Sequence, residues 1–340
     1  MTRSRARLWL SFGGAIILGL AVLAFSVPAR GQGDPLPPFG IVGPPTPTPD
    51  PRPTPNHRAF IANVASDPSG CAALPSNVTP GSDTTWTLPG SRPRRYEVHF
   101  PARARSGEKL PLVLNFHGLA ADGKIQADLS RFAVTADAHN FIVVSPDGTG
   151  SPRGWDALLK PPGVADDISF VRQLLEQVER DFCVDELRVY AAGFSNGAMF
   201  ASRLACVLAN RIAAAGAVAG VYRPFEECPR NVPVVAVHGT ADDTVPFEQG
   251  TIIDTYPYPG AHRAISDWAA AGSTCTPAAE LFLITPQLSR EQFRGCGHNE
   301  SLLYIVSGGG HNWPDEFATS DALWAFFRDH TQPPDALLRR

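Results

Sequence analysis

Three residues of this 340-residue chain have the types and the order that nucleophilic catalysis requires. Ser195 is the centre of the stretch GFSNG, which matches the pattern G-x-S-x-G. A serine hydroxyl attacks poorly unless a base takes its proton and a further group orients that base. Asp242 and His311 follow in the chain as acid and base, and Asp243 is the reserve for the acid. The combination predicts acyl-transfer chemistry.

Each of these residues follows an apolar run that reads as a β-strand. Ser195 comes after 188–192 and directly before a helical pattern over 196–208. Asp242 follows the run 233–238, and His311 follows 302–307 after three consecutive glycines. Because the carboxyl ends of parallel strands meet at one edge of a sheet, we expect the three side chains to lie together.

An oxyanion hole is expected beside the serine. One N–H would come from Asn196, the residue after the nucleophile, and the second from Leu119 in the turn that follows the run 111–116. His117 in that turn is expected to be a structural hydrogen-bonding residue. Three aromatic residues are candidates for a substrate-binding wall, with a place in the core as the alternative for each: Trp155, Tyr222 and Trp313.

The hydrophobic pattern around these residues predicts an α/β fold. Short apolar runs at 95–100, 111–116, 141–145, 188–192, 233–238 and 302–307 alternate with helical stretches. The segment 166–182 has apolar residues at four-residue steps, and Asp321 is expected to cap a last helix. Nearly continuous apolar strands separated by helices indicate a mostly parallel sheet with helices on both faces.

The first 57 residues differ in composition from the rest. Residues 1–29 combine three arginines, an apolar run and small residues near Ala29, which is typical of a signal peptide; a retained membrane anchor is the alternative. Residues 30–57 are rich in Pro and Thr and predict an extended linker. We expect one catalytic domain over 58–340 and a chain exported to the outside of the cell.

Composition and cysteine count limit the function classes. The net charge is −4, from 29 basic and 33 acidic residues, without a basic stripe that would predict nucleic-acid binding. The six cysteines do not have the spacing of a metal site, so we expect no metal. In an exported chain an even number of cysteines predicts disulfides, and six allow 15 pairings. Asn77 begins a glycosylation sequence, Asn-Val-Thr.

Several stretches together resemble the secreted feruloyl esterase and polyhydroxybutyrate depolymerase family of α/β-hydrolases. They are RVYAAGFSNGAM, VAVHGTADDTVPF, GGGHNWP, PLVLNFHG, ADDISFV and CVDELRVY. The resemblance runs from about Cys71 to the final helix. It implies hydrolysis of carboxylic esters without a cofactor, with Ser195 as nucleophile, Asp242 as acid and His311 as base. It also suggests the disulfides Cys275–Cys296 and Cys206–Cys228, which leaves Cys71 for Cys183.

We therefore expect a secreted serine esterase, a monomer that acts on feruloyl or acetyl esters of plant polysaccharides. An extracellular polyester depolymerase with the same three residues is the principal alternative. A peptidase and a non-catalytic, surface-tethered binding protein are further alternatives. Contact with a membrane is expected only through an uncleaved N-terminal segment.

Overall fold

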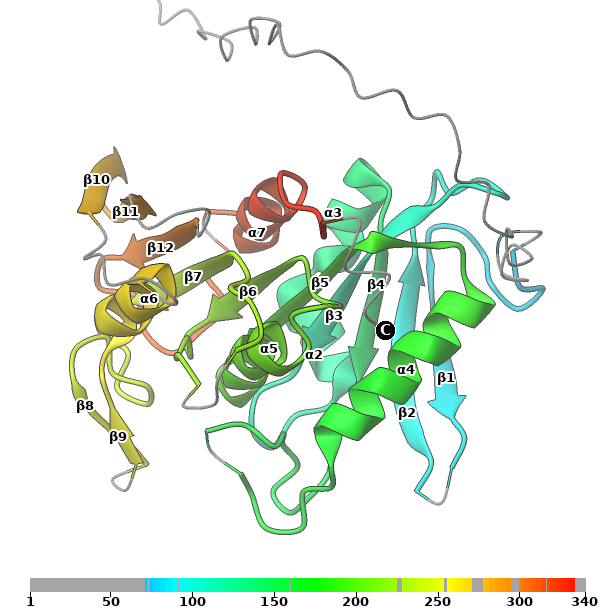
Figure 1. Ribbon diagram of the computed structural model, residues 1–340, viewed down its shortest axis with the longest axis horizontal. Helices are drawn as coiled ribbons and strands as arrows, with labels where there is room; N and C mark the ends of the chain where they lie inside the picture. The colour runs from blue at the N-terminus through cyan, green and yellow to red at the C-terminus, as the bar shows by residue number, and fades with distance from the viewer. Residues whose placement is uncertain are drawn as a thin grey trace, which may run out of the picture. The chain divides into compact units, whose positions relative to one another are not determined.

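Ten strands form one sheet in the computed structural model, which describes residues 71, 74–90, 92–158, 160–224, 228–253, 256–270, 278–294, 300–315 and 317–333. The strand order is β1-β2-β4-β3-β5-β6-β7-β12-β11-β10 (Figure 1). The pairs from β4 across to β12 are parallel, whereas the pairs at both ends of the sheet are antiparallel. The predicted signal peptide or membrane anchor at 1–29 and the predicted linker at 30–57 lie outside the described residues.

The strands have the following bounds: β1 Ser82–Leu88, β2 Arg94–Phe100, β3 Leu110–Phe116, β4 Ile142–Pro146, β5 Val184–Phe194, β6 Ala214–Val218, β7 Val234–Gly239, β10 Ala278–Thr285, β11 Leu288–Arg294 and β12 Ser301–Val306. A separate hairpin consists of β8 Gly250–Ile252 and β9 Tyr256–Tyr258. All six predicted strands are present. The sequence analysis did not identify β1, β6, β10, β11 or the hairpin.

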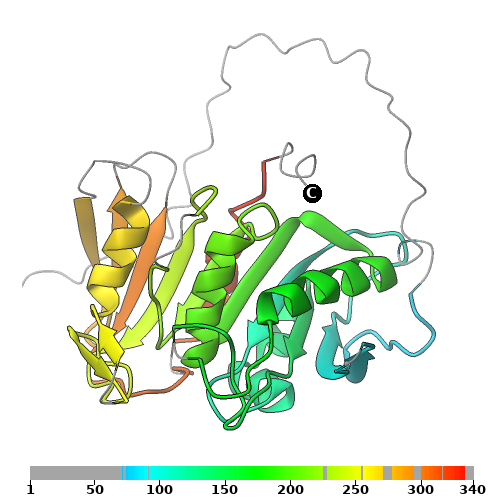
Figure 2. The same cartoon turned by 60° about the horizontal axis from the view of Figure 1, so that its bottom comes forward.

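The helices are α2 Gly123–Ser130, α3 Phe132–His139, α4 Asp167–Asp181, α5 Asn196–Val207, α6 Ala261–Ala270 and α7 Thr319–Phe327. Helices α4, α5 and α6 pack on one face of the sheet, as Figure 2 shows, and α3 and α7 pack on the other. Neighbouring residues of β3 therefore belong to different cores: Leu112 and Leu114 to the first, Val113 to the second. Burial on both faces explains why the central strands are continuous apolar runs.

The start of α7 differs from the prediction. Ala318, with φ 53°, is the N-cap residue, and Asp321 lies inside the first turn. The Asp321 carboxylate accepts a hydrogen bond from the hydroxyl of Thr135 on α3 at 2.6 Å. The aspartate thus joins two helices rather than capping one.

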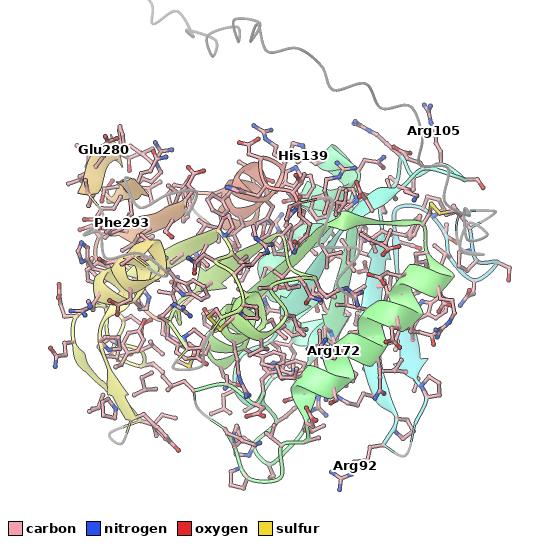
Figure 3. All side chains as sticks on the ribbon, in the orientation of Figure 1. Arg92, Arg105, His139, Arg172, Glu280 and Phe293 are labelled. Carbon is pink, nitrogen blue, oxygen red and sulfur yellow. A yellow bond between two sulfur atoms is a disulfide. The ribbon has the colours of Figure 1, made fainter. Side chains whose placement is uncertain are left out.

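Charged side chains such as Arg105 and Glu280 lie at the periphery of the domain (Figure 3).

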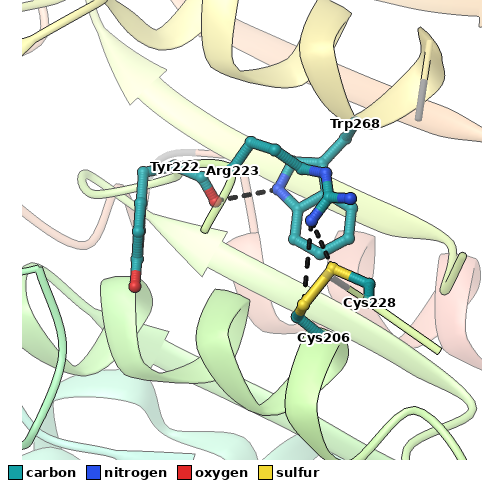
Figure 4. The surroundings of a disulfide bond; sticks show 5 residues. All are labelled: Cys206, Tyr222, Arg223, Cys228 and Trp268. Atoms are coloured by element: carbon teal, nitrogen blue, oxygen red, sulfur yellow. Dashed lines mark hydrogen bonds between the residues drawn. A yellow bond between two sulfur atoms is a disulfide. The ribbon is translucent and has the colours of Figure 1, made fainter. Parts of the chain in front are cut away.

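Two disulfides are present among the described residues, and both match the pairings that the resemblance implied. Cys71 is bonded to Cys183, and Cys206 at the end of α5 is bonded to Cys228. The guanidinium of Arg223 lies against the second disulfide and 4.7 Å from the ring centre of Trp268 (Figure 4). Cys275 and Cys296 lie outside the described residues.

No helix within the described ranges is long and apolar enough to cross a membrane. Nor do the residues with described positions include a group of three His, Cys, Asp or Glu side chains that could hold a metal ion.

The cysteine pairing can be tested by peptide mapping under non-reducing conditions. We expect three linked pairs, including Cys275–Cys296, because these residues lie three positions before β10 and two after β11, and Ala278 is paired directly with Arg294. Mass spectrometry of the exported protein would detect the linked peptides. Three or more free thiols would contradict this framework.

Candidate active site

Ser195 lies at a sharp turn between the end of β5 and the start of α5. Its backbone has φ 54° and ψ −120°, a conformation that costs a non-glycine residue about 1–3 kcal/mol. The flanking glycines make the turn possible. A Cβ atom on Gly193 would lie 2.4 Å from the Gly197 backbone, and one on Gly197 would lie 2.2 Å from the carbonyl oxygen of Phe116. The strand–turn–helix context that the sequence predicted is therefore present.

The side chains of Ser195, His311 and Asp242 form a continuous hydrogen-bonded series. His311 Nε2 is 2.9 Å from Ser195 Oγ, and His311 Nδ1 is 2.8 Å from Asp242 Oδ2. Because a carboxylate only accepts hydrogen bonds, Nδ1 carries the proton and Nε2 is the acceptor for the serine hydroxyl. The His311 ring also packs on Phe194, with 4.9 Å between ring centroids. This geometry suits removal of a proton from Ser195.

Asp242 is held as a buried carboxylate. Its Oδ1 accepts hydrogen bonds from the backbone N–H groups of Thr244 and Val245, at 3.0 and 2.8 Å. Burial acts to raise the pKa of Asp242, but hydrogen bonds from His238, His311 and Val245 outweigh it and lower the pKa well below its usual range. The carboxylate therefore keeps its negative charge throughout the neutral and mildly acidic range.

The reserve candidate for the acid lies elsewhere. Asp243 is exposed, and its carboxylate accepts a hydrogen bond from the neighbouring Thr244 hydroxyl at 3.2 Å. Asp242 is the aspartate that contacts His311.

A second histidine, which the sequence analysis did not single out, lies behind Asp242. His238 ends the apolar part of β7 and is almost fully buried. Its Nε2 donates to the carbonyl oxygen of Val245 at 2.8 Å and lies 3.4 Å from Asp242 Oδ2. The only sequence signal is a polar residue at the end of an apolar strand, four positions before the aspartate.

His117 fixes the turn that was predicted to complete an oxyanion hole. The ring is fully buried; its Nδ1–H donates to Gly118 O at 2.7 Å, and its Nε2 accepts from Gly148 N at 2.8 Å. Burial lowers the pKa of His117 to about 4, so the ring is neutral at pH 7. The prediction of a structural hydrogen-bonding role agrees with these contacts.

A pocket of about 300 Å³ opens beside Ser195. Leu119 and Asn196, the predicted sources of the oxyanion N–H groups, both belong to its wall. Most of the remaining wall is apolar and comes from α2 and the segment before it, from the loop after β7, and from β8 with the residue after it: Ala121, Ile125, Leu129, Val245, Ile252 and Ile253. The sequence analysis did not identify these aliphatic residues, because α2 and β8 are short and their position beside Ser195 depends on the fold.

The three aromatic candidates for a substrate wall do not line this pocket. Trp155 is fully buried and its indole N–H donates to His117 O at 2.9 Å. Trp313 is 4% exposed and packs edge-on against Phe132. Tyr222 is 5% exposed and lines a different pocket, near Arg223. Their hydrophobic area is buried in the protein, so the alternative of a core role describes them better.

Low pH should destabilise the fold through His117. His117 has an ordinary pKa of about 6.5 in the unfolded chain and a pKa of about 4 in the folded protein. Between these pH values the unfolded chain binds a proton that the folded protein does not bind. The free energy of unfolding therefore falls as pH drops from about 6.5 to about 4. The His117 contribution between pH 7 and pH 5 amounts to about 2 kcal/mol. Glutamine does not titrate, so between pH 7 and pH 5 the free energy of unfolding of His117→Gln should fall by about 2 kcal/mol less than that of wild type. Urea unfolding at both pH values measures this difference.

The matched control for this measurement is His139→Gln, because His139 is an exposed histidine on α3. The free energy of unfolding of this variant should fall between pH 7 and pH 5 by as much as that of wild type. Equal losses in wild type and His117→Gln would contradict the assignment to His117.

The sequence of the chain is similar to a known family and to several named enzymes. The profile described as "Esterase PHB depolymerase" matches residues 95–273, which include Ser195 and Asp242. The chain is 32% identical over 155 residues to a bifunctional acetylxylan esterase/xylanase of Neocallimastix patriciarum, covering 45% of this chain and 22% of that protein. It is 29% identical over 235 residues to feruloyl esterase B of Piromyces equi, and the match covers 64% of this chain and 42% of that protein. The chain thus spans less than half the length of these two relatives.

A further relative matches along most of its length. Feruloyl esterase D of Neurospora crassa is 27% identical over 288 residues, which cover 77% of this chain and 90% of that one.

Among solved structures, acetyl xylan esterase from Aspergillus awamori superposes with a TM-score of 0.54 at 18% identity, covering 72% of this chain and 99% of that chain. A thermostable esterase gives a TM-score of 0.52 at 15% identity, and the match covers 73% of this chain and 63% of that chain. At these identities the likeness shows the fold, which is of the α/β-hydrolase type. With the profile match across more than half of its residues, the chain belongs to the esterase PHB depolymerase family.

Proposed function

We propose that this protein is a serine hydrolase of carboxylic esters, with Ser195 as nucleophile, His311 as base and Asp242 as the acid that orients His311. The observation that carries the proposal is the series of hydrogen bonds from Ser195 Oγ through His311 to Asp242, at 2.9 and 2.8 Å, beside an apolar pocket. The family membership and the named esterases among the relatives support the same reaction class.

The first half of the reaction forms an acyl-enzyme. Ser195 Oγ attacks the ester carbonyl carbon while its proton passes to His311 Nε2, and the carbonyl π electrons move to the oxygen. The N–H groups of Leu119 and Asn196 stabilise that oxyanion; removal of one such donor typically costs about 2.7–4 kcal/mol. When the tetrahedral intermediate collapses, His311 gives the proton to the departing alkoxide.

The second half releases the acid. His311 takes a proton from water, the hydroxide attacks the acyl carbon, and Ser195 leaves with the proton returned by His311. Asp242 stabilises the imidazolium that forms in both halves, and its lowered pKa keeps it charged while it does so. The chemistry requires neither a metal nor a cofactor.

The natural substrate that we propose is a feruloyl or acetyl ester of plant polysaccharide. The residues that form the pocket wall contain no Lys, Arg, Asp or Glu, so the wall favours an uncharged acyl group. The relatives named as feruloyl and acetylxylan esterases support this class. A polyester depolymerase is the second candidate, which the name of the esterase PHB depolymerase family favours.

We also propose that the protein works outside the cell. Disulfides form and persist in oxidising compartments, and the described part of the chain has two. Asn77, which begins the glycosylation sequence Asn-Val-Thr, is exposed, so an exported protein could be modified there. We further propose that residues 1–29 direct export and that 30–57 act as a linker to the domain at 58–340.

Replacement of the nucleophile tests the proposal directly. Ser195→Ala should lower the hydrolysis of p-nitrophenyl acetate by at least about 10⁴-fold, because no other group can form the acyl-enzyme. A fluorophosphonate probe should label wild type at the Ser195 peptide and should not label the variant.

Ser202→Ala is the matched control. Ser202 is a fully buried serine on the same helix, with its hydroxyl bonded to Ala198 O at 3.0 Å, so this variant should keep both labelling and activity. Turnover by a folded Ser195→Ala protein would refute the proposed nucleophile.

The acyl class can be tested with a pocket variant and three substrates. Wild type should release ferulate from methyl ferulate faster than it clears a polyhydroxybutyrate suspension. Leu129→Trp places a larger side chain in the pocket wall and should raise KM for methyl ferulate by about tenfold, with little effect on p-nitrophenyl acetate.

Val134→Trp, at an exposed position of α3 that is not part of this wall, should leave all three activities unchanged. Rapid clearing of the polyester without turnover of methyl ferulate would instead establish the depolymerase.

A further inference from the structure

A buried ion pair lies outside the Ser195 pocket and has no part in the mechanism above. Arg94, the first residue of β2, and Asp167, the first residue of α4, are 7% and 0% exposed. Arg94 Nη1 is 2.5 Å from Asp167 Oδ1, and the guanidinium lies 3.5 Å from the ring centre of Phe170. A buried pair of this kind is weak evidence for stability, since its desolvation offsets most of its attraction.

The remaining donors and acceptors of the pair hold both ends of one loop, which we call the 147–156 loop. Arg94 donates to the carbonyl oxygen of Asp147 through Nε at 3.0 Å and Nη2 at 2.7 Å. Asp167 Oδ2 accepts from the backbone N–H of Asp156 at 2.8 Å. Between these ends, Thr149 and Gly154 exchange two backbone hydrogen bonds, at 3.1 and 2.8 Å. The ion pair therefore connects the two ends of the loop to each other, beside the separate hydrogen bonds that Asp147 makes with Arg95 and Gly123.

The inner side of the 147–156 loop contacts the segment that contains Leu119. Gly148 N donates to His117 Nε2 at 2.8 Å, and the Trp155 indole N–H donates to His117 O at 2.9 Å. Arg153 O accepts from Ala120 N at 2.7 Å. These bonds hold the residues on both sides of Leu119.

The same loop also contacts the other oxyanion residue. Trp155 N donates to Asn196 Oδ1 at 2.8 Å, and Asn196 is 1% exposed. One loop thus links the residues that supply both proposed oxyanion N–H groups, and those residues come from different strand ends.

We propose that Arg94 and Asp167 are positioning residues for the oxyanion hole and act through the 147–156 loop. This inference rests on the proposed function. It assigns to the pair an effect on the transition state, where the oxyanion forms, rather than on binding of the ester. A displacement of the donors of 1 Å or less is enough to matter, because catalytic hydrogen bonds need positions fixed within about 0.5 Å.

Two variants separate positioning from folding. Asp167→Asn removes the negative charge of the pair and leaves one acceptor oxygen for two donors, Arg94 Nη1 and Asp156 N. The double variant Arg94→Met with Asp167→Leu replaces the pair by apolar side chains, a change that often leaves stability equal or higher. It removes the hydrogen bonds that the pair itself makes to Asp147 and Asp156. In both variants we expect kcat for p-nitrophenyl butyrate to fall about 10- to 100-fold with KM within about twofold.

The decisive measurement is the inhibition constant of an alkyl trifluoromethyl ketone. Ser195 Oγ adds to its carbonyl carbon, the proton passes to His311 and the carbonyl oxygen becomes an oxyanion in the same hole. The inhibition constant should rise in proportion to the loss of kcat/KM, which a purely structural role would not produce. Hydrogen exchange at the Gly148 and Trp155 amides should become faster in both variants.

Glu179→Gln is the matched control. Glu179 lies on the same helix as Asp167 and pairs with Arg211 at 2.6 Å, with exposed fractions of 14% and 9%, but makes no contact with the loop in the described structure. It should leave kcat and the inhibition constant unchanged.

Three results would overturn the positioning role: folded variants with kcat within twofold of wild type, a loss of kcat without a matching rise of the inhibition constant, or unfolding of both variants while Glu179→Gln folds. A wild-type protein that neither hydrolyses esters nor binds the ketone would instead refute the proposed function, and the inference with it.

Discussion

The left-handed backbone of Ser195 is the constraint on which the rest of the site depends. This conformation is costly, and the surrounding structure must enforce it. Ser195 N donates to Val218 O on the neighbouring strand at 2.9 Å, and Ser195 O accepts from Met199 N in the first turn of α5 at 3.0 Å. Strand and helix thus hold the residue from both sides. The sheet then brings the loops after β7 and β12 to the same edge, which is why Asp242 and His311 reach a serine that is distant in sequence.

The sequence predicted those features that follow from local pattern. Apolar runs predicted the central strands, because burial on both faces requires continuous apolar sequence. They did not predict β6, since its sequence AAGAV has a single β-branched residue, nor β10, which is exposed along its whole length at the edge of the sheet. The positions of Ser195, Asp242 and His311 were predictable for a related reason: each follows a strand whose carboxyl end lies at the same edge.

The pocket and the aromatic residues were not predictable in this way. Trp155 is a large aromatic residue in a loop, and its sequence context does not distinguish a substrate wall from a buried support. Its place is determined by two partners, His117 and Asn196, that are 38 and 41 positions away in the chain. Likewise the aliphatic wall from Ile125 and Ile252 exists only once α2 and the β8 hairpin are packed beside Ser195. Long-range contacts of this kind leave no periodic signal in the sequence.

The two sides of Ser195 differ in electrostatics, and the difference suits the proposed reaction. On the side of His311, Asp242 keeps an ionised carboxylate because hydrogen bonds overcome the cost of burial. On the oxyanion side, burial dominates: it raises the pKa of Asp167 and lowers that of His117. A lone buried carboxylate there would oppose a developing oxyanion, but Arg94 neutralises Asp167 and His117 is uncharged at pH 7. The carboxylate that faces His311 therefore stays ionised, whereas the buried carboxylate on the oxyanion side is paired with Arg94, and the oxyanion of the proposed reaction is stabilised by N–H dipoles.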